Sequence, residues 1–105
     1  MEFPLILSEN GDLSFYRSLE MAERSLEVID VVNGEYEGFD AIGRSLRLTP
    51  VSKNRVQISL VEQSPLQIQH LETLVRNFLT RFGADRPIDC SLSELLSYCD
   101  RFIER

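Results

Sequence analysis

Apolar and polar residues alternate in several short stretches of the chain, and a period of two is typical of β-strands with one buried face. The alternation is clearest at 55–63 and weaker at 35–41 and 44–52, so three strands are predicted there. Asn-Gly-Asp at 10–12 predicts a turn between two further apolar runs. These runs, FPLIL and LSFYR, could pair as a hairpin, although FPLIL could also be only an extended arm.

Apolar residues recur every three or four positions in three other stretches, which predicts amphipathic helices. The first begins at the N-cap Ser18 and should end before the β-branched residues at 28–32, ahead of an Asn-Gly turn. The second covers 64–82, with Ser64 as its cap, the following proline at its first position and Gly83 as its stop.

The third helix is predicted from Ser91 to the end of the sequence at residue 105. Ser91 and Glu94 have the spacing of a capping box, and the apolar positions after them continue at helical spacing. The pattern as a whole predicts one α+β domain over 1–105. Its expected architecture is a small antiparallel meander with one early helix and two C-terminal helices packed on one face.

Composition favours a folded globular protein and argues against a membrane-spanning or secreted one. The 105 residues are 43% apolar, which suits a folded globular chain. No apolar run is long enough to span a membrane, and the N-terminus lacks the basic segment of a signal peptide. Cys90 and Cys99 fit neither a zinc motif nor a redox pair, so two reduced thiols and a cytoplasmic location are expected.

Charge is distributed unevenly along the sequence. Residues 1–40 contain ten acidic residues and two arginines, whereas residues 41–105 contain seven acidic residues and nine basic ones. An acidic half of this kind argues against binding to nucleic acid, which requires a basic surface. It favours a basic protein partner whose approach is accelerated by the electrostatic field, although the acids could also serve only solubility.

Catalytic chemistry has little support in the sequence. No nucleophile elbow, phosphate-binding loop, dinucleotide-binding loop or zinc-protease motif is present. His70 is the only histidine and is expected to be a solvated helix residue. The acids at 30–40 lack the order of a calcium loop. The chain is therefore expected not to be an enzyme and to need neither metal nor cofactor.

A partner-binding surface is the more economical interpretation of these acids, because aromatic side chains beside charged ones are typical of interfaces. The candidate partner-binding residues are Glu20, Glu23, Glu27, Asp30, Glu35, Tyr36, Glu37 and Asp40.

One part of the chain carries a more specific pattern. Its residues are Ser18, Leu19, Ala22, Glu23, Leu26, Glu27, Asp30, Val31, Glu35, Tyr36, Phe39, Asp40, Gly43 and Leu46. With these residues, the stretch 12–48 resembles small bacterial immunity proteins of polymorphic-toxin and contact-dependent-inhibition systems. The resemblance implies a non-enzymatic cytoplasmic inhibitor that binds one cognate toxin domain. It carries over no individual functional residue.

Two functional hypotheses follow. The first is an immunity protein that covers the basic surface or active site of a toxin, expected to be a nuclease, with an acidic face. The second is a homodimeric regulatory or interaction module without a toxin partner, in which the edge of the strand at 44–52 or a helix face pairs with a second copy. Neither hypothesis involves nucleic acid or a membrane.

Overall fold

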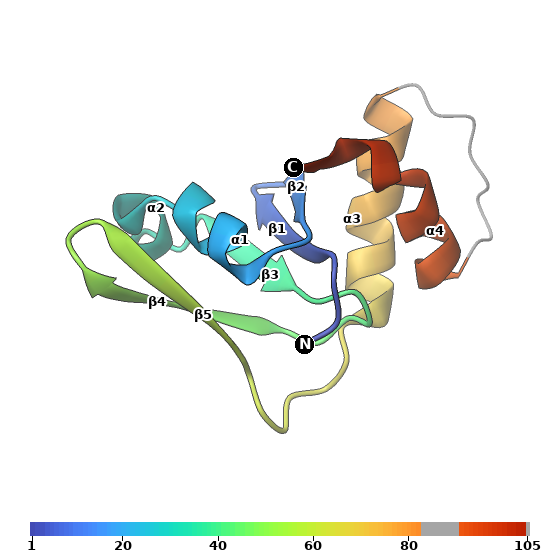
Figure 1. The fold of residues 1–105 in the computed structure, drawn as a ribbon. Helices are drawn as coiled ribbons and strands as arrows, with labels where there is room; N and C mark the ends of the chain where they lie inside the picture. Colours follow the sequence, from blue (N-terminus) through green and yellow to red (C-terminus); the bar gives the residue numbers. More distant parts are fainter. Residues whose placement is uncertain (83–90, 105) are drawn as a thin grey trace.

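The computed structural model describes residues 1–82 and 91–104. The β-strands are β1 (Leu5–Glu9), β2 (Asp12–Tyr16), β3 (Tyr36–Phe39), β4 (Leu46–Ser52), β5 (Arg55–Leu60) and β6 (Ile103–Glu104). The helices are α1 (Leu19–Ser25), α2 (Val28–Val32), α3 (Ile68–Arg81), α4 (Leu92–Tyr98) and the short 3-10 helix η1 (Asp100–Phe102). The predicted α+β class is confirmed (Figure 1).

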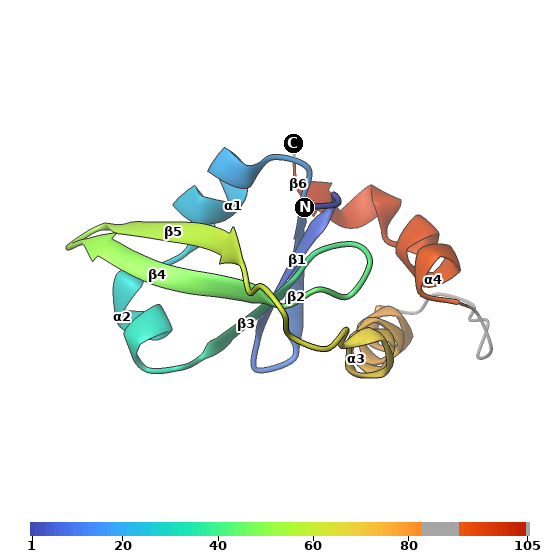
Figure 2. The same cartoon turned by 90° about the horizontal axis from the view of Figure 1, so that it is seen from below.

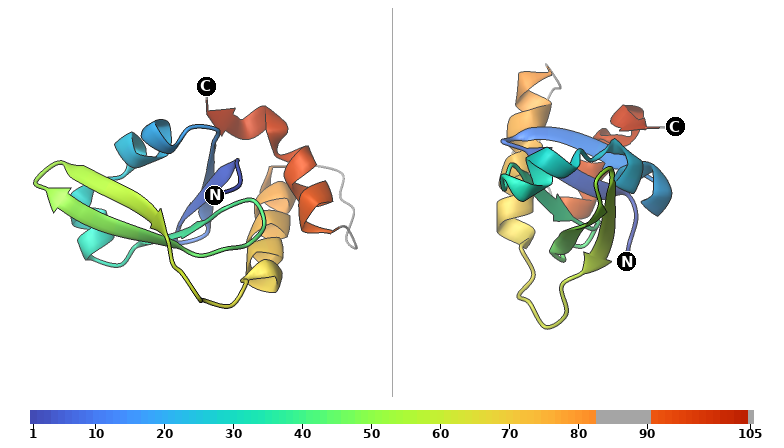
Figure 3. Two further views of the ribbon diagram at one scale, coloured as in Figure 1. Left: turned by 60° about the horizontal axis from the view of Figure 1, so that its bottom comes forward. Right: turned by 90° about the vertical axis from the view of Figure 1, so that its left-hand side faces the viewer.

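The sheet arrangement differs from the predicted meander. Four strands form a central sheet in the order β3-β1-β2-β6, while β4 and β5 form a separate two-stranded sheet. β6 runs parallel to β2, because the end of the chain returns to the central sheet after α4 instead of continuing as a helix. The hairpin β4–β5 projects away from the central sheet on the side opposite α3 (Figure 3).

Two apolar clusters, one on each face of the central sheet, form the core. Successive side chains of a strand point to opposite faces. Ile6 and Phe15 accordingly pack with α3 and α4, whereas Leu5 and Leu7 pack with α1 and the β4–β5 hairpin. Helices therefore lie on both faces of the sheet, and not on one as predicted (Figure 2).

Turn chemistry confirms the first hairpin. Asn10 and Gly11 adopt φ angles of 55° and 92° between β1 and β2. Such left-handed values at both central positions match the right-handed twist of the flanking strands. FPLIL therefore contributes a central strand, and Ile6 pairs with Phe15 across the hairpin.

The helix boundaries confirm two predictions and correct two. Ser18 caps α1, and Ser91 forms the expected capping box with Glu94. Residues 28–32 form the additional short helix α2, although they are β-branched and acidic. α3 begins at Ile68 instead of Pro65, because Ser64 and its neighbours belong to the connection from β5. The predicted stop at Gly83 lies outside the described residues.

The described cysteine agrees with the expectation of a reduced thiol. Cys99 is free and fully buried, and burial raises the pKa of its thiol to about 12. A thiol with so high a pKa is a poor nucleophile, because the thiolate is the reactive form. Cys90 lies outside the described residues.

Candidate functional site

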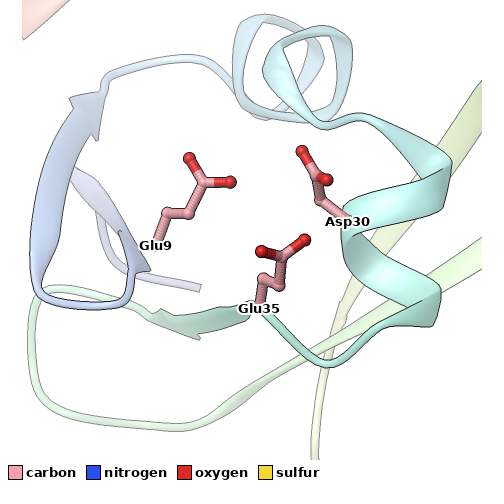
Figure 4. A group of neighbouring side chains, drawn as sticks. All are labelled: Glu9, Asp30 and Glu35. Carbon is pink, nitrogen blue, oxygen red and sulfur yellow. The ribbon is translucent and has the colours of Figure 1, made fainter.

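Three carboxylates meet at one end of the central sheet. Glu9 ends β1, Asp30 lies on α2, and Glu35 directly precedes β3 (Figure 4). One carboxylate oxygen of each lies within 4.8 Å of the others. All three side chains are partly exposed. We call Glu9, Asp30 and Glu35 the acidic cluster.

Local structure brings these residues together across 26 positions of sequence. The turn after α2 places Gly34 at φ 72°, where glycine is favoured, and sends the chain back beside α2. The N–H of Glu35 then donates to the carbonyl of Asp30 at 3.0 Å. Because Glu9 pairs with Tyr36 in the ladder between β1 and β3, Glu35 also comes next to Glu9.

The cluster concentrates negative charge without a compensating cation. None of the three carboxylates forms an ion pair within the described parts of the chain, 1–82 and 91–104. Hydrogen bonding to Asp30 and its negative charge raise the pKa of Glu35, and Glu9 adds to the effect. Desolvation by burial raises the pKa of Tyr36, and the charges of Glu9, Asp30 and Glu27 raise it further.

Neutralising the cluster should stabilise the fold. The pKa of Glu35 is higher in the folded chain than its ordinary value of 4.5. The folded state therefore binds the proton more tightly, and the contribution of this group to stability falls as pH rises from the ordinary value through the raised one. We expect Glu35→Gln to raise the Tm near neutral pH, and we expect the gain to disappear as the pH falls through the raised pKa toward the ordinary value of 4.5.

Glu62→Gln is the matched control for this measurement, because Glu62 is exposed and has no ion-pair partner among the described residues. It removes the same charge from a different surface. Thermal melts of both variants at several pH values separate repulsion within the cluster from the overall net charge. Equal Tm shifts in the two variants would contradict this account of the cluster.

The cluster also has the ligand type of a hard-cation site. Carboxylate oxygens are the usual ligands of calcium and magnesium, and each of the three residues offers one. No other group of three such side chains comes as close together among the described residues. Exposed acids commonly gather without an ion, however, and the structure offers no second feature that would identify a metal here.

Two other predicted residues lie near the acidic cluster. Tyr36 begins β3 and is partly buried. The negative charges of Glu9, Asp30 and Glu27 contribute to the raised pKa of its hydroxyl. Glu27 is exposed and occupies the N-cap of α2 without a capping hydrogen bond from its side chain.

Glu37 points to the other face of β3, toward α3. Its carboxylate lies 3.0 Å from Nε2 of His70, and both side chains are about half exposed. His70 is thus exposed as expected, but it has an acidic neighbour 33 positions away that spacing along the helix could not reveal. The ring of His70 also packs edge-on against that of Phe39.

The two acidic side chains predicted on α1 both interact with other groups of the protein. Glu20 forms an exposed ion pair with Arg24, one helical turn away. Glu23 accepts a hydrogen bond from the N–H of Ile58 at 2.7 Å, which ties α1 to β5. Neither belongs to the acidic cluster.

Asp40 corrects the prediction of a continuous acidic surface. It is fully buried, and its carboxylate accepts hydrogen bonds from the N–H groups of Glu2, Ile42 and Arg44 and from Nε of Arg44. Burial alone would raise its pKa, but these hydrogen bonds outweigh burial and leave the pKa below its ordinary value. Asp40 organises the loop after β3 and is not exposed to a partner.

Glu9 is the member of the cluster that sequence reasoning missed. It follows an apolar run and precedes a turn, so the local sequence predicts only an acidic residue at the end of a strand. Only the pairing of β1 with β3 places it beside Glu35. The local sequence holds no signal of that proximity, since the two residues are far apart along the chain.

A further groove lies between the N-terminal residues and α4. Its volume is about 610 Å³, and its lining includes Phe3, Ile42 and Leu96. Arg17 and Asp100 also line it and form an ion pair at 2.6 Å. Among the described residues, its lining contains no histidine or cysteine to act as base or nucleophile.

The edge of the hairpin β4–β5 is interrupted by a proline and a bulge. Pro50 lies within β4, and the pairing with β5 is irregular between Pro50 and Ser52. Proline and bulges discourage the addition of another strand at an edge. The geometry of this edge therefore does not favour a dimer built by strand pairing there.

Comparison with protein-family models, with curated proteins and with solved structures finds no match to this chain. Among the described residues, no helix combines the length and apolar character required to cross a bilayer.

Proposed function

We propose that this chain is a non-enzymatic binding protein whose acidic cluster receives basic side chains of a protein partner. The observation that carries the proposal is the convergence of Glu9, Asp30 and Glu35, each partly exposed and none paired with a cation in the described part of the chain. Mutual repulsion makes this arrangement unfavourable in the free protein. A lysine or arginine placed between the carboxylates would relieve the repulsion and form charge-assisted hydrogen bonds.

The partner class we propose is a basic toxin domain, with a nuclease as the first candidate. Support comes from the resemblance of residues 12–48 to immunity proteins and from the excess of acids in residues 1–40. Active sites that act on nucleic acid are basic, so an acidic face would both attract and cover them. The free, buried thiol of Cys99 is compatible with a reducing, cytoplasmic setting.

The test is a salt-dependent pull-down with a matched pair of variants. The tagged chain is used as bait at low and high salt, and the captured protein is identified and purified. The neutralised variant carries Glu9→Gln, Asp30→Asn and Glu35→Gln. The control variant carries Glu2→Gln, Glu62→Gln and Glu104→Gln, which removes the same charge from exposed side chains without ion pairs among the described residues.

We expect a basic partner whose affinity falls with salt and drops on the order of 100-fold in the neutralised variant. The control variant should lose much less, since its acids lie outside the cluster. Calorimetry with the purified pair measures both effects. Equal losses in the two variants would reject the cluster as the binding site, and a partner indifferent to salt would reject the electrostatic basis of the proposal.

A further inference from the structure

We propose that the exposed apolar side of α2 anchors the partner interface and receives an amphipathic helix of the partner, whose apolar side is flanked by lysines or arginines. This inference deepens the proposed function and rests on it, because it places an apolar contact directly beside the acidic cluster. It is carried by a separate observation, the exposure of two neighbouring aliphatic side chains.

Ile29 and Val32 are the two exposed aliphatic residues of α2. Their side chains are 66% and 68% exposed. Because they lie three positions apart on a helix, they are neighbours on one side of it. Scattered apolar side chains are ordinary on a protein surface, whereas contiguous ones point to an interaction site. We call Ile29 and Val32 the apolar pair.

The apolar side of α2 is wider than the core requires. Val28 and Val31 pack against the apolar cluster that includes residues of α1 and of the β4–β5 hairpin. Each residue advances about 100° around a helix, so the apolar pair lies next to Val28 and is followed by Asp30. Val28 and Val31 already attach α2 to the protein, and the apolar pair is therefore left for a contact outside it.

α2 has little stability of its own. It has five residues, four of which are β-branched and disfavour a helix. Glu27 at its N-cap makes no capping hydrogen bond, and no residue of α2 is fully buried. The negative charges of Asp30 and Glu35 also repel each other. A partner that covers the apolar pair would therefore stabilise α2, because local stability grows with buried apolar contact.

The acidic cluster determines which partner fits. Asp30 follows Ile29 around α2 and meets Glu9 and Glu35 on that side (Figure 4). A partner seated on the apolar pair would meet these carboxylates at its margin, so lysines or arginines beside its apolar residues complement the surface. A second copy of this chain would instead bring its own acidic cluster against the first, and the like charges would oppose that contact.

The shape of the surface favours a helix as the occupant. α2 lies at the outer end of the molecule, beside the β4–β5 hairpin and away from α3 and α4 (Figure 1). The apolar pair runs along the axis of α2, with the acidic cluster beside it. Helices pack side by side through such rows of side chains. An amphipathic helix therefore fits along α2, with its apolar row on the apolar pair and its basic row on the acidic cluster.

The experiment uses three synthetic peptides as probes. The first contains two repeats of Lys-Leu-Ala-Lys-Lys-Leu-Ala, which places leucines on one side of a helix and lysines on the other. The second has the same composition in an order that scatters the leucines around the helix, and the third replaces each lysine of the first by glutamate. Each is titrated into the full chain by calorimetry, and we expect the first peptide to bind best.

Hydrogen exchange shows whether the first peptide covers α2. The N–H of Val31 donates to the carbonyl of Glu27, and the N–H of Asn33 donates to that of Ile29, so both report on opening of α2. We expect the first peptide to slow exchange at these two amides about tenfold or more, as followed by NMR.

A matched pair of double variants separates the apolar contact from the charge. Ile29→Thr with Val32→Thr keeps the β-branching and the net charge but places two hydroxyls in the contact. Ile42→Thr with Leu66→Thr is the control, because these side chains are 45% and 53% exposed and lie in the loops before β4 and α3. We expect only the first double variant to bind the first peptide about tenfold more weakly. Circular dichroism checks that both variants fold.

The outcomes distinguish this inference from the proposed function. Binding that weakens on neutralising the acidic cluster, but not in the variant of the apolar pair, would overturn the apolar anchor and leave the acidic binding site standing. Equal binding of the first and second peptides, or no binding of the first, would also overturn the anchor. The pull-down with the matched variants decides the proposed function independently.

Sedimentation of the free chain tests the second copy as the alternative occupant. We expect no dimer that depends on the apolar pair. A dimer that dissociates in the variant with Ile29→Thr and Val32→Thr would assign this surface to self-association and overturn the partner helix.

Discussion

Phe15→Ala is expected to cost about 3–5 kcal/mol of folding free energy. Phe15 is fully buried in β2, and its ring meets that of Phe78 edge-on with centroids 5.3 Å apart. It also lies opposite Ile103, where β6 joins the sheet. Truncation would leave a cavity where the sheet, α3 and the C-terminal strand meet.

Urea denaturation of Phe15→Ala and Phe82→Ala measures this effect against a matched control. Phe82 also contacts Phe78, at 4.7 Å between ring centroids, but its side chain is 51% exposed. We expect its loss to stay near 1 kcal/mol, because little apolar surface returns to water. Similar losses in the two variants would show that Phe15 is not the centre of this cluster.

Asp40→Ala is expected to cost about 2–4 kcal/mol, although this acid is one of many on the chain. The substitution leaves three backbone N–H groups and the guanidinium of Arg44 without their acceptor. Asp40 is fully buried, and the Arg44 side chain is 34% exposed. Loss of the carboxylate should therefore release the loop at 40–44 and the N-terminal arm together.

The effect of Asp40 should also depend on pH. Because hydrogen bonds hold its pKa below the ordinary value of 3.8, its contribution is complete above that value and is lost as pH falls through the lower, folded-state pKa. The wild type should therefore lose stability in acid more steeply than Asp40→Asn does. Denaturation of both proteins between neutral pH and about pH 2 measures this difference.

Asp100→Ala is the control for a carboxylate in an exposed ion pair. Asp100 contacts Arg17 at 2.6 Å, but the two side chains are 62% and 55% exposed. Solvent screens such pairs, so we expect a loss below about 1 kcal/mol. A loss as large as that of Asp40→Ala would contradict the assignment of the Asp40 effect to burial.

The acidic cluster and Asp40 show how similar residues acquire opposite roles. Each is a carboxylate within the acidic first part of the chain, and sequence patterning grouped Asp30, Glu35 and Asp40 on one expected surface. Donors surround Asp40 and stabilise its charge, whereas Asp30 and Glu35 face each other and Glu9. Near neutral pH, Glu35→Gln is therefore expected to stabilise the fold, whereas Asp40→Asn is expected to destabilise it.

The structure brings together those candidate residues that are neighbours in sequence. Asp30, Glu35 and Tyr36 are close along the chain, and the Asn-Gly turn that brings them together could be predicted from its residues. Glu9 and the pairing of His70 with Glu37 could not, because both arise from contacts between separate elements.

The sequence by itself determined the α+β class, the first hairpin, the strand at 55–60 and the caps at Ser18 and Ser91. These features follow from periodicity and turn chemistry within a few residues. Only the tertiary structure decided that the strands divide into two sheets, that β6 joins parallel to β2, and that helices cover both faces. The physical reason is that a strand pattern fixes which side chains are buried, whereas its partner strand is chosen by the packing of the whole core.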